Sequence, residues 1–379
     1  MIPYGKQNIS QDDIASVVDI LNSDFLTQGP AVEKFERAIA EYVGAKYAVS
    51  ACNATAALHL ACRALGLQQG DVLWTSPNTF LASANCALYC GASVDFVDID
   101  PSTLNMCPNL LAEKLAHAAK INKLPKIIMP VHFSGFSCDM EKISHLAKKY
   151  GCYVIEDASH AIGAQYKNKK VGNGEYSDIT IFSFHPVKII TTGEGGMAVT
   201  NKMALYRKMQ ALRSHGMTRN QEHMTKLSEG AWYYEQIDLG YNYRLTDIQA
   251  ALGLTQLKSI EKFIERRRCL VNGYHEKLKN LPIQLPLYSE LNQSSWHLYV
   301  IQVDNRAEIF AKLRTAGIGV NVHYIPVHTQ PYYQKLGFKM GDFPNAEYYY
   351  SRAITLPLFY DLSERDQNVV VEKLKDFLT

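Results

Sequence analysis

Short apolar runs alternate with amphipathic stretches along the chain from about residue 47. The runs have the length of buried strands, and the stretches between them repeat apolar residues at helical spacing. The predicted strands are Tyr47–Ala51, Val72–Thr75, Ser93–Asp98, Ile127–Val131 and Tyr153–Asp157. The predicted helices between them are Thr55–Leu65, Thr79–Tyr89, Leu110–Ala119 and Met140–Tyr150. Strands that alternate with helices indicate βαβ units and an α/β fold with a large, mostly parallel sheet.

The pattern changes near residue 246, after two further apolar runs at 178–183 and 197–200. Thr246-Asp247-Ile248-Gln249 is a capping box, which predicts the start of a long helix. We expect this helix to end at the arginines 266–268, interpreted as a solvated helix end. Beyond residue 282 the pattern predicts a smaller α+β unit. Its expected strands and helices are His297–Val303, Arg306–Ala316, Val320–Tyr324 and Glu364–Leu378.

We therefore expect two domains in the 379 residues. Residues 1–250 would form a large α/β domain with an N-terminal arm. Residues 251–379 would form a bridging helix and a small C-terminal α+β domain. Parallel sheets bind ligands at the carboxyl ends of their strands, so the residues that follow each predicted strand are the first candidates for a functional site.

Composition and charge argue against several classes of protein. Lys and Arg number 39 against 37 Asp and Glu, and a formal charge of +2 favours neither a nucleic-acid-binding protein nor a basic membrane-surface protein. The eight cysteines are scattered and form no C-x-x-C pair, so we expect buried reduced thiols. The first residues lack a signal-peptide pattern, and the longest charge-free stretch, 72–94, contains proline, asparagine and glycine. We therefore predict a cytoplasmic protein outside the membrane.

The strand predicted at Tyr153–Asp157 ends in two acids. Asp157 is expected at the carboxyl end of a buried strand, where an ionised carboxylate is costly without a cationic partner. A functional carboxylate is one interpretation, and a helix N-cap or a Mg²⁺ ligand are the alternatives.

Lys188 has unusually apolar sequence neighbours, Val187 and Ile189. Desolvation lowers the pKa of an amine, and a neutral amine attacks carbonyl groups. The glycine-rich stretch 193–196 that follows would allow the backbone to pass close to a ligand. A loop lysine that points into water is the alternative.

Two further features follow the first two predicted strands. Asn53-Ala54-Thr55-Ala56 lies at a strand-to-helix junction, where free backbone N–H groups and a hydroxyl favour phosphate binding. A simple N-cap at Asn53 or Thr55 is the alternative. Phe80 follows the strand Val72–Thr75, where an aromatic ring could stack on a flat heterocycle or pack in the core.

Together these four features are the parts of a pyridoxal phosphate (PLP) site. In such a site a helix start binds the 5′-phosphate, an aromatic ring covers the pyridine ring, a carboxylate keeps the ring nitrogen protonated and a lysine binds the aldehyde. The features occur in this order on successive βα units. We therefore predict a PLP enzyme.

The sequence resembles the DegT/DnrJ/EryC1/StrS family of sugar aminotransferases, which have the aspartate aminotransferase fold (fold type I). The resemblance spans the chain. It is carried by Leu26-Thr27-Gln28-Gly29-Pro30, Asn53-Ala54-Thr55-Ala56-Ala57-Leu58, Glu156-Asp157-Ala158-Ser159-His160-Ala161, Phe182-Ser183-Phe184-His185-Pro186-Val187-Lys188, Gly193-Glu194-Gly195-Gly196 and Gly240-Tyr241-Asn242-Tyr243-Arg244-Leu245.

This resemblance implies roles for the candidate residues. Lys188 would be the Schiff-base lysine and proton shuttle, Asp157 the partner of the pyridine nitrogen, and His160 a neighbour of the ring or its 3′-oxygen. Asn242 would reach the phosphate from a second subunit, which implies a homodimer with shared active sites. The implied cofactor-binding residues are Ala54, Thr55, Phe80, Asp157, His160, Ser183, Lys188 and Asn242.

Within the family, His160 and the stretches 212–217 and 321–324 are most similar to the branch that acts in pseudaminic acid biosynthesis. The implied reaction is PLP-dependent transfer of an amino group from L-glutamate to the C4 keto group of a UDP-linked 4-keto-6-deoxy-N-acetyl-hexosamine. The implied substrate contacts are Tyr4, Asp24, Phe25, Leu26, Thr27, Ala54, Ser183, Asn242, Asn321, Val322, His323 and Tyr324.

Other activities stay open at this point. One alternative is amino transfer to another 4-keto or 3-keto nucleotide sugar, linked to GDP or dTDP. Another is a PLP sugar dehydratase, although that branch of the family has histidine in place of Lys188. A regulator or DNA-binding protein would need a basic face, which the charge of +2 does not favour. The chain has no His-Glu-x-x-His motif, and we expect no catalytic metal.

Overall fold

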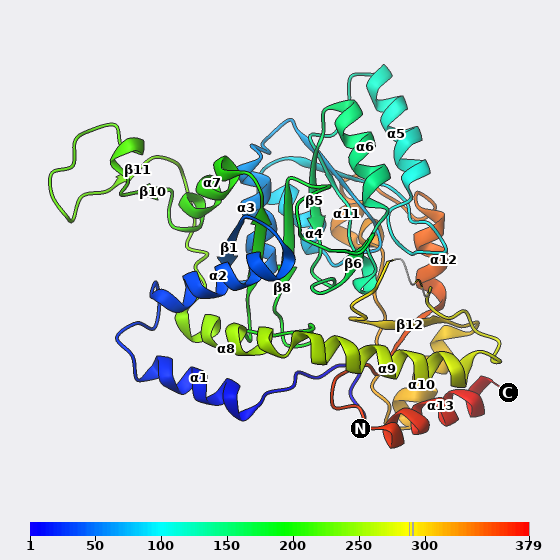
Figure 1. The fold of residues 1–379 in the computed structure, drawn as a ribbon. Coiled ribbons are helices and arrows are strands. Elements are labelled where there is room, and N and C mark those ends of the chain that lie inside the picture. The colour runs from blue at the N-terminus through cyan, green and yellow to red at the C-terminus, as the bar shows by residue number, and fades with distance from the viewer. Residues whose placement is uncertain (288, 290–291, 379) are drawn as a thin grey trace.

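A seven-stranded sheet lies at the centre of the computed structural model, which describes residues 1–287, 289 and 292–378 (Figure 1). Its strand order is β1-β9-β8-β5-β4-β2-β3. The strands are β1 (Tyr47–Ala51), β2 (Val72–Thr75), β3 (Ser93–Phe96), β4 (Ile127–Met129), β5 (Tyr153–Asp157), β8 (Ile179–Ser183) and β9 (Gly196–Thr200). Neighbouring strands from β3 to β8 pair in parallel, and β9 runs antiparallel to both β1 and β8. The predicted α/β fold with a mostly parallel sheet is confirmed.

Both faces of this sheet are covered by helices, which explains why its strands are nearly continuous apolar runs. Successive side chains of a strand point to opposite faces. Ile127 of β4 therefore packs with the helices α3 (Ala54–Ala64) and α4 (Ala82–Tyr89), whereas Ile128 packs on the other face with α5 (Pro108–Lys120) and α6 (Met140–Tyr150). Figure 1 shows α5 and α6 side by side on that face.

The remaining described elements surround this centre. Short strand pairs are β6 (Gln165–Tyr166) with β7 (Lys169–Lys170), β10 (Met217–Thr218) with β11 (Glu235–Gln236), and β12 (Tyr299–Gln302) with β13 (Ala353–Leu356). The other helices are α1 (Gln11–Leu21), α2 (Pro30–Val43), α7 (Met203–Arg213), α8 (Asp247–Lys258), α9 (Ile260–Leu278), α10 (Arg306–Thr315), α11 (Pro331–Gln334), α12 (Pro344–Arg352) and α13 (Glu364–Leu378).

The capping box at the start of α8 is confirmed. The Thr246 hydroxyl accepts a hydrogen bond from the Gln249 backbone N–H, and the Gln249 side chain accepts one from the Thr246 N–H. The predicted end of the long helix at residues 266–268 is wrong, because after a break at Ser259 the helix α9 continues to Leu278. Its apolar face persists beyond the arginines, and burial of that face keeps the chain helical.

Arg267 corrects the interpretation of the arginine run as a solvated helix end. Its side chain is buried, and its Nη1 donates to the carbonyl oxygens of Trp296, His297 and Leu358 over 3.0 to 3.2 Å. The guanidinium therefore ties α9 to two segments that lie far away in the sequence.

The C-terminal part of the chain has its own apolar core. Helices α10 and α13 pack around the antiparallel pair β12 and β13, with Tyr274 and Leu374 among the fully buried residues. Helix α9 joins this core through Tyr274 and the core of the sheet through Phe263. The domain boundary at residue 250 stays a prediction.

The strand predicted at Val320–Tyr324 is wrong. Asn321 forms an isolated bridge with Thr355, and the chain then turns toward the sheet. The Tyr324 N–H donates to Asn78 and the Val327 N–H to the carbonyl of Pro77, so loop contacts replace a strand ladder. This segment thereby brings C-terminal side chains to the sheet edge.

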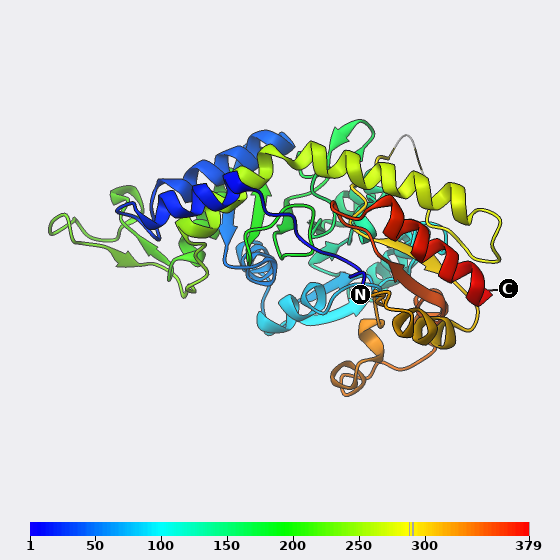
Figure 2. The same cartoon turned by 90° about the horizontal axis from the view of Figure 1, so that it is seen from below.

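A long extension, residues 214–240, projects away from the body of the molecule in both views (Figures 1 and 2). Gly216 at its base has a φ of +69°, and a Cβ there would lie 1.9 Å from the carbonyl oxygen of Asp238, so only glycine fits. Trp232 is 72% exposed and Leu227 84% exposed on this extension. Within the described residues, no helix is both long and apolar enough to span a bilayer.

Candidate active site

A cavity of about 570 Å³ opens at the carboxyl edge of the sheet. Its walls come from the ends of β5 and β8, the starts of α3 and α4, the N-terminal segment and the loop around residue 322. Twelve residues proposed from the sequence line it: Tyr4, Ala54, Thr55, Phe80, Asp157, His160, Ser183, Lys188, Asn321, Val322, His323 and Tyr324. Topology therefore brings together residues that are spread over most of the chain.

The other proposed residues lie outside this cavity. Residues Asp24, Phe25, Leu26 and Thr27 are exposed in the loop between α1 and α2, where the Leu26 carbonyl accepts from the Asp247 N–H at the start of α8. Asn242 is exposed and forms an isolated bridge with Ser214 at the base of the extension. A single chain does not bring these residues to the site.

Asp157 ends β5 and is 4% exposed. Its Oδ2 accepts a hydrogen bond of 2.6 Å from the Ser83 hydroxyl, and its Oδ1 accepts one of 3.1 Å from the Ser159 N–H. The Ser83 hydroxyl lies 2.7 Å from that of Thr79. No Lys, Arg or His nitrogen of the described chain lies within ion-pair distance of Asp157, so this buried acid is left to face the cavity without a cation in contact.

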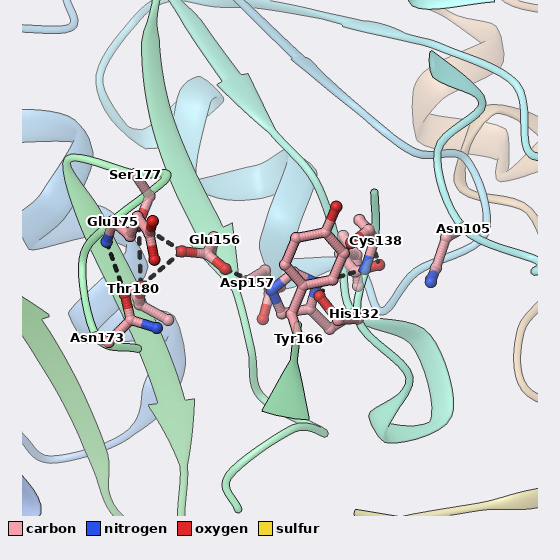
Figure 3. A network of polar contacts seen from close by, with 12 residues as sticks. Asn105, His132, Cys138, Glu156, Asp157, Tyr166, Asn173, Glu175, Ser177 and Thr180 are labelled. Carbon is pink, nitrogen blue, oxygen red and sulfur yellow. Dashed lines mark hydrogen bonds and ion pairs between the residues drawn. The ribbon is translucent and has the colours of Figure 1, made fainter. Parts of the chain in front are cut away.

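Glu156, the preceding residue, points to the opposite side of the sheet and holds the end of β5 in place (Figure 3). Its carboxylate binds His132 Nε2 at 2.7 Å and accepts from the hydroxyls of Ser177 and Thr180. Burial alone would raise the pKa of Glu156, but these hydrogen bonds lower it below its usual value. The backbone N–H of His132 donates to the Asp157 carbonyl, which links this network to the cavity side.

Lys188 follows β8, is half-buried and lines the cavity. Burial lowers the pKa of its amine to about 8, although the nearby Asp157 carboxylate acts in the other direction. A fraction of the amine is therefore unprotonated near neutral pH and ready to react with a carbonyl carbon.

His160 is a neutral hydrogen-bonding group. The backbone N–H of Ser134 donates to its Nδ1 over 3.3 Å, so the ring proton is on Nε2, which lies 3.0 Å from the Tyr324 hydroxyl. Burial, together with the charges of Lys188 and His323, holds the pKa of His160 well below its usual value. The ring therefore donates to Tyr324 without carrying charge.

The start of α3 forms the other end of the cavity. Asn53 is its N-cap and accepts from the Ala56 N–H over 2.8 Å, which confirms that interpretation of Asn53 and leaves the preceding helix N–H groups without intrahelical partners. A Cβ on Gly196 would lie 2.5 Å from the Asn53 carbonyl oxygen, so glycine is needed for β9 to pass behind this turn. Ser183 adds a hydroxyl at the end of β8.

Sequence reasoning missed several cavity residues, among them Ser83 and His297. Ser83 lies inside an apolar stretch. Its position three residues after Phe80 was the one signal in the sequence that could have indicated a place near the site. The ring of His297 lies 4.4 Å from the ring of His160, between centroids, and no local pattern distinguishes it from a core histidine. Burial, followed by the charge of Lys188, holds the pKa of His297 well below its usual value.

Comparison with known proteins shows that the chain is similar to one family of enzymes over nearly its whole length. The model of the DegT/DnrJ/EryC1/StrS aminotransferase family matches residues 7–375. The chain is 40% identical over its full length to 97% of the spore coat polysaccharide biosynthesis protein SpsC of Bacillus subtilis. It is also 40% identical over its full length to 98% of the UDP-4-amino-4,6-dideoxy-N-acetyl-beta-L-altrosamine transaminase of Campylobacter jejuni. A proposed sugar aminotransferase of Streptococcus pneumoniae, solved in its pyridoxamine phosphate form, superposes over all of this chain and 99% of its own with a TM-score of 0.92 at 32% identity.

The residues of the cavity fit PLP, the cofactor of these enzymes. The buried Asp157 has no cation in contact, which a protonated pyridine nitrogen would supply. The start of α3 offers free N–H groups for a phosphate. The lowered pKa of Lys188 suits an amine that must bind an aldehyde. In the described part of the chain, no group of three or more His, Cys, Asp or Glu could hold a metal ion.

Proposed function

We propose that this chain, which belongs to the DegT/DnrJ/EryC1/StrS aminotransferase family, transfers an amino group from L-glutamate to the C4 keto group of a UDP-linked 4-keto-6-deoxy-N-acetyl-hexosamine. The chain is a PLP-dependent nucleotide-sugar aminotransferase. What we propose beyond this is the identity of the amino donor and of the acceptor sugar. The observation that carries the chemistry is the half-buried Lys188, whose amine has a lowered pKa, in one cavity with the buried carboxylate of Asp157. The Campylobacter jejuni relative supports the choice of acceptor.

The bound cofactor supplies an aldehyde that exchanges amino groups and a ring that withdraws electrons from the reacting carbon. Lys188 would hold that aldehyde and would carry the proton that moves during the amino transfer. Asp157, fixed by Ser83, would keep the ring nitrogen protonated. Ala54, Thr55 and Ser183 would bind the phosphate, and Phe80 and His160 would lie against the ring.

The acceptor sugar would occupy the part of the cavity between the N-terminal segment and the loop around residue 322. Tyr4, Asn321 and His323 line this part. The His323 Nδ1 lies 2.8 Å from the Thr355 hydroxyl, and burial lowers the pKa of His323 to about 3, so its imidazole stays neutral. A neutral imidazole can both donate and accept hydrogen bonds, as the hydroxyls of a sugar do.

A homodimer is part of this proposal. The loop Asp24–Thr27 and Asn242 are exposed outside the cavity of their own chain, and the projecting extension exposes Leu227 and Trp232. An exposed apolar extension of this kind needs a partner. In the dimer, Asn242 of the partner subunit would reach the phosphate, and the partner's loop would contact the nucleotide. We place the protein in the cytoplasm, because its eight cysteines are free thiols.

A second candidate is the same transfer to a different nucleotide sugar. The Bacillus subtilis relative is equally similar and has a different name, so identity alone does not favour one acceptor. The two candidate acceptors would differ in their nucleotide and in the ring carbon that receives the amino group.

The decisive experiment incubates the purified enzyme with PLP, L-glutamate and a panel of UDP-, GDP- and dTDP-linked 4-keto and 3-keto sugars. We expect a 4-amino product from the UDP-linked 4-keto-6-deoxy-N-acetyl-hexosamine, identified by mass and NMR, and its loss in Lys188→Ala. Preference for another sugar would support the second candidate. A deoxygenated product without consumption of glutamate would show a dehydratase and contradict both.

A further inference from the structure

One buried side chain of the cavity has no hydrogen-bond partner in the described chain. His297 is 4% exposed and lines the cavity. Its Nδ1 is enclosed by protein and has no partner, and no described group bonds its Nε2. Such a ring is uncommon in a folded protein, because burial removes its hydrogen bonds to water and nothing replaces them. Since Nδ1 is enclosed, Nε2 is the nitrogen that is left to face the cavity.

The backbone around His297 is fixed from several sides. The His297 N–H donates to the Ser134 carbonyl over 2.9 Å, and its carbonyl accepts from Arg267 Nη1 over 3.2 Å. Trp296, the residue before it, has a φ of +54°, which is costly for a bulky side chain. The Trp296 carbonyl accepts from the same Arg267 nitrogen over 3.1 Å. These contacts hold a strained turn that places the imidazole in the wall of the cavity.

The cavity has no permanent cation for a carboxylate other than the reactive lysine. The residues of the described chain that line it include no arginine, and Lys188 is their only lysine. The argument here rests on the proposed function, in which an α-amino acid donates the amino group. Its α-carboxylate is attached to the carbon that carries this group, and therefore comes close to Lys188 during the transfer. A carboxylate in a partly closed cavity needs a hydrogen-bond donor.

The other histidines of the cavity are engaged or exposed. The Nδ1 of His160 accepts from a backbone N–H, and its Nε2 lies 3.0 Å from a tyrosine hydroxyl. The Nδ1 of His323 lies 2.8 Å from a threonine hydroxyl. His185 is exposed to solvent. His297, with its ring centroid 4.4 Å from that of His160, is therefore the buried histidine that has a nitrogen to offer.

We propose that His297 binds the α-carboxylate of the amino donor, with its Nε2–H donating to a carboxylate oxygen. In the empty cavity, burial, followed by the charge of Lys188, holds the pKa of His297 well below its usual value, so the imidazole is neutral. A neutral group suits a cavity that receives an anionic amino acid first and an uncharged sugar ring afterwards. An arginine at this position would be left as an unpaired charge when the sugar is bound.

The first test follows the reaction of the PLP-loaded enzyme with L-glutamate, without any sugar, by the loss of the absorbance of the PLP form. His297→Asn has a shorter side chain that does not reach the position of Nε2. The glutamate concentration for half-maximal rate should rise about tenfold in this variant, because a hydrogen bond to a charged group is lost. His297→Gln places an amide N–H near that position and should stay within about threefold of the wild type.

Calorimetry with glutarate, which is glutamate without its amino group, measures binding without turnover. The dissociation constant of glutarate should rise about tenfold in His297→Asn, whereas the affinity of the apoenzyme for PLP should not change. His59→Asn is the matched control. His59 is also 4% exposed with an unpartnered Nε2, but it lies on α3 outside the cavity, so this variant should bind glutarate as the wild type does.

The outcomes separate this inference from the proposed function. Equal glutarate affinity in the wild type and His297→Asn would overturn the role of His297 and leave the proposed function intact. Weaker binding of PLP with unchanged binding of glutarate would place the ring against the cofactor and would also overturn it. A wild type that reacts with no α-amino acid would contradict the donor in the proposed function, and this inference with it.

Discussion

The Ser83 hydroxyl donates a hydrogen bond of 2.6 Å to the Oδ2 of Asp157. This contact joins the first turn of α4 to the end of β5, two elements that lie 74 positions apart in the chain. It also fixes the rotation of a carboxylate that has no ion-pair partner in the described chain. The position of this acid in the cavity therefore depends on a serine that the sequence alone does not single out.

Ser83→Ala should weaken PLP binding about tenfold, because a hydrogen bond to a charged group contributes about 1.5 kcal/mol or more. Absorbance titration of the apoenzyme with PLP measures the change. The control is Ser144→Ala, which removes a buried hydroxyl on α6. Equal affinities of the two variants would show that Ser83 does not position the acid.

The amine of Lys188 should react with acetic anhydride in the apoenzyme with a midpoint near pH 8, since burial lowers its pKa to about 8. Below that pH the amine is protonated and unreactive. Asp157→Asn should move the midpoint lower, because it removes a charge that favours the ammonium form. Peptide mass spectrometry follows the labelling. Lys142, whose pKa is raised by its hydrogen bond with Asp139, is the internal control.

His160→Gln should leave the acid limb of the kcat/KM profile unchanged and keep activity within about tenfold of the wild type. The reason is that His160 stays neutral, with its pKa held well below the usual value by burial and by Lys188 and His323. Glutamine retains a neutral donor for Tyr324. Loss of an ionisation near pH 6.5 in the variant would show that His160 titrates in the working enzyme.

Arg267→Met should lower the free energy of unfolding by about 3 kcal/mol, because three buried carbonyl oxygens lose their donor. Urea unfolding measures the loss. Arg314→Met removes the same charge from an exposed position on α10 and should change stability by less than about 0.5 kcal/mol. Similar losses in both variants would contradict a structural role for the buried guanidinium.

Trp232→Asp should shift the protein from dimer to monomer in sedimentation velocity at micromolar concentration and lower its activity in parallel. The side chain is 72% exposed on the projecting extension of a single chain, and a charge there would oppose burial in an interface. Met340→Asp, at a position 62% exposed beyond α11, is the matched control and should stay dimeric. A monomeric wild type would contradict the proposed dimer.

Local patterns were sufficient for much of the fold and part of the site. The capping box at Thr246 and the apolar run at Tyr153–Asp157 are short-range signals, and the structure has both elements where the patterns predicted them. Local patterns predicted five of the cavity residues, Ala54, Thr55, Phe80, Asp157 and Lys188, and the resemblance to a known family added the other seven. Each of the five found from local patterns ends a strand, follows one or starts a helix.

The features that were missed depend on long-range contacts. Arg267 has the pattern of a solvated helix end, and only the carbonyls of Trp296, His297 and Leu358, far along the chain, explain its burial. The segment around Val322 has the β-branched pattern of a strand, yet its backbone bonds to the loop at Asn78 instead. No window of sequence contains both partners of such contacts.

The two acids at the end of β5 serve opposite sides of one strand, with Glu156 bound to His132 and Asp157 directed into the cavity. A shift of this strand by a single residue would exchange them. The longer acid would then enter the position that we propose for the contact with the pyridine nitrogen, and the shorter one would be too far from the imidazole of His132 to bind it. The order of the two acids along β5 therefore matters as much as their presence. Deletion of one residue from this strand should reduce activity more than replacement of either acid.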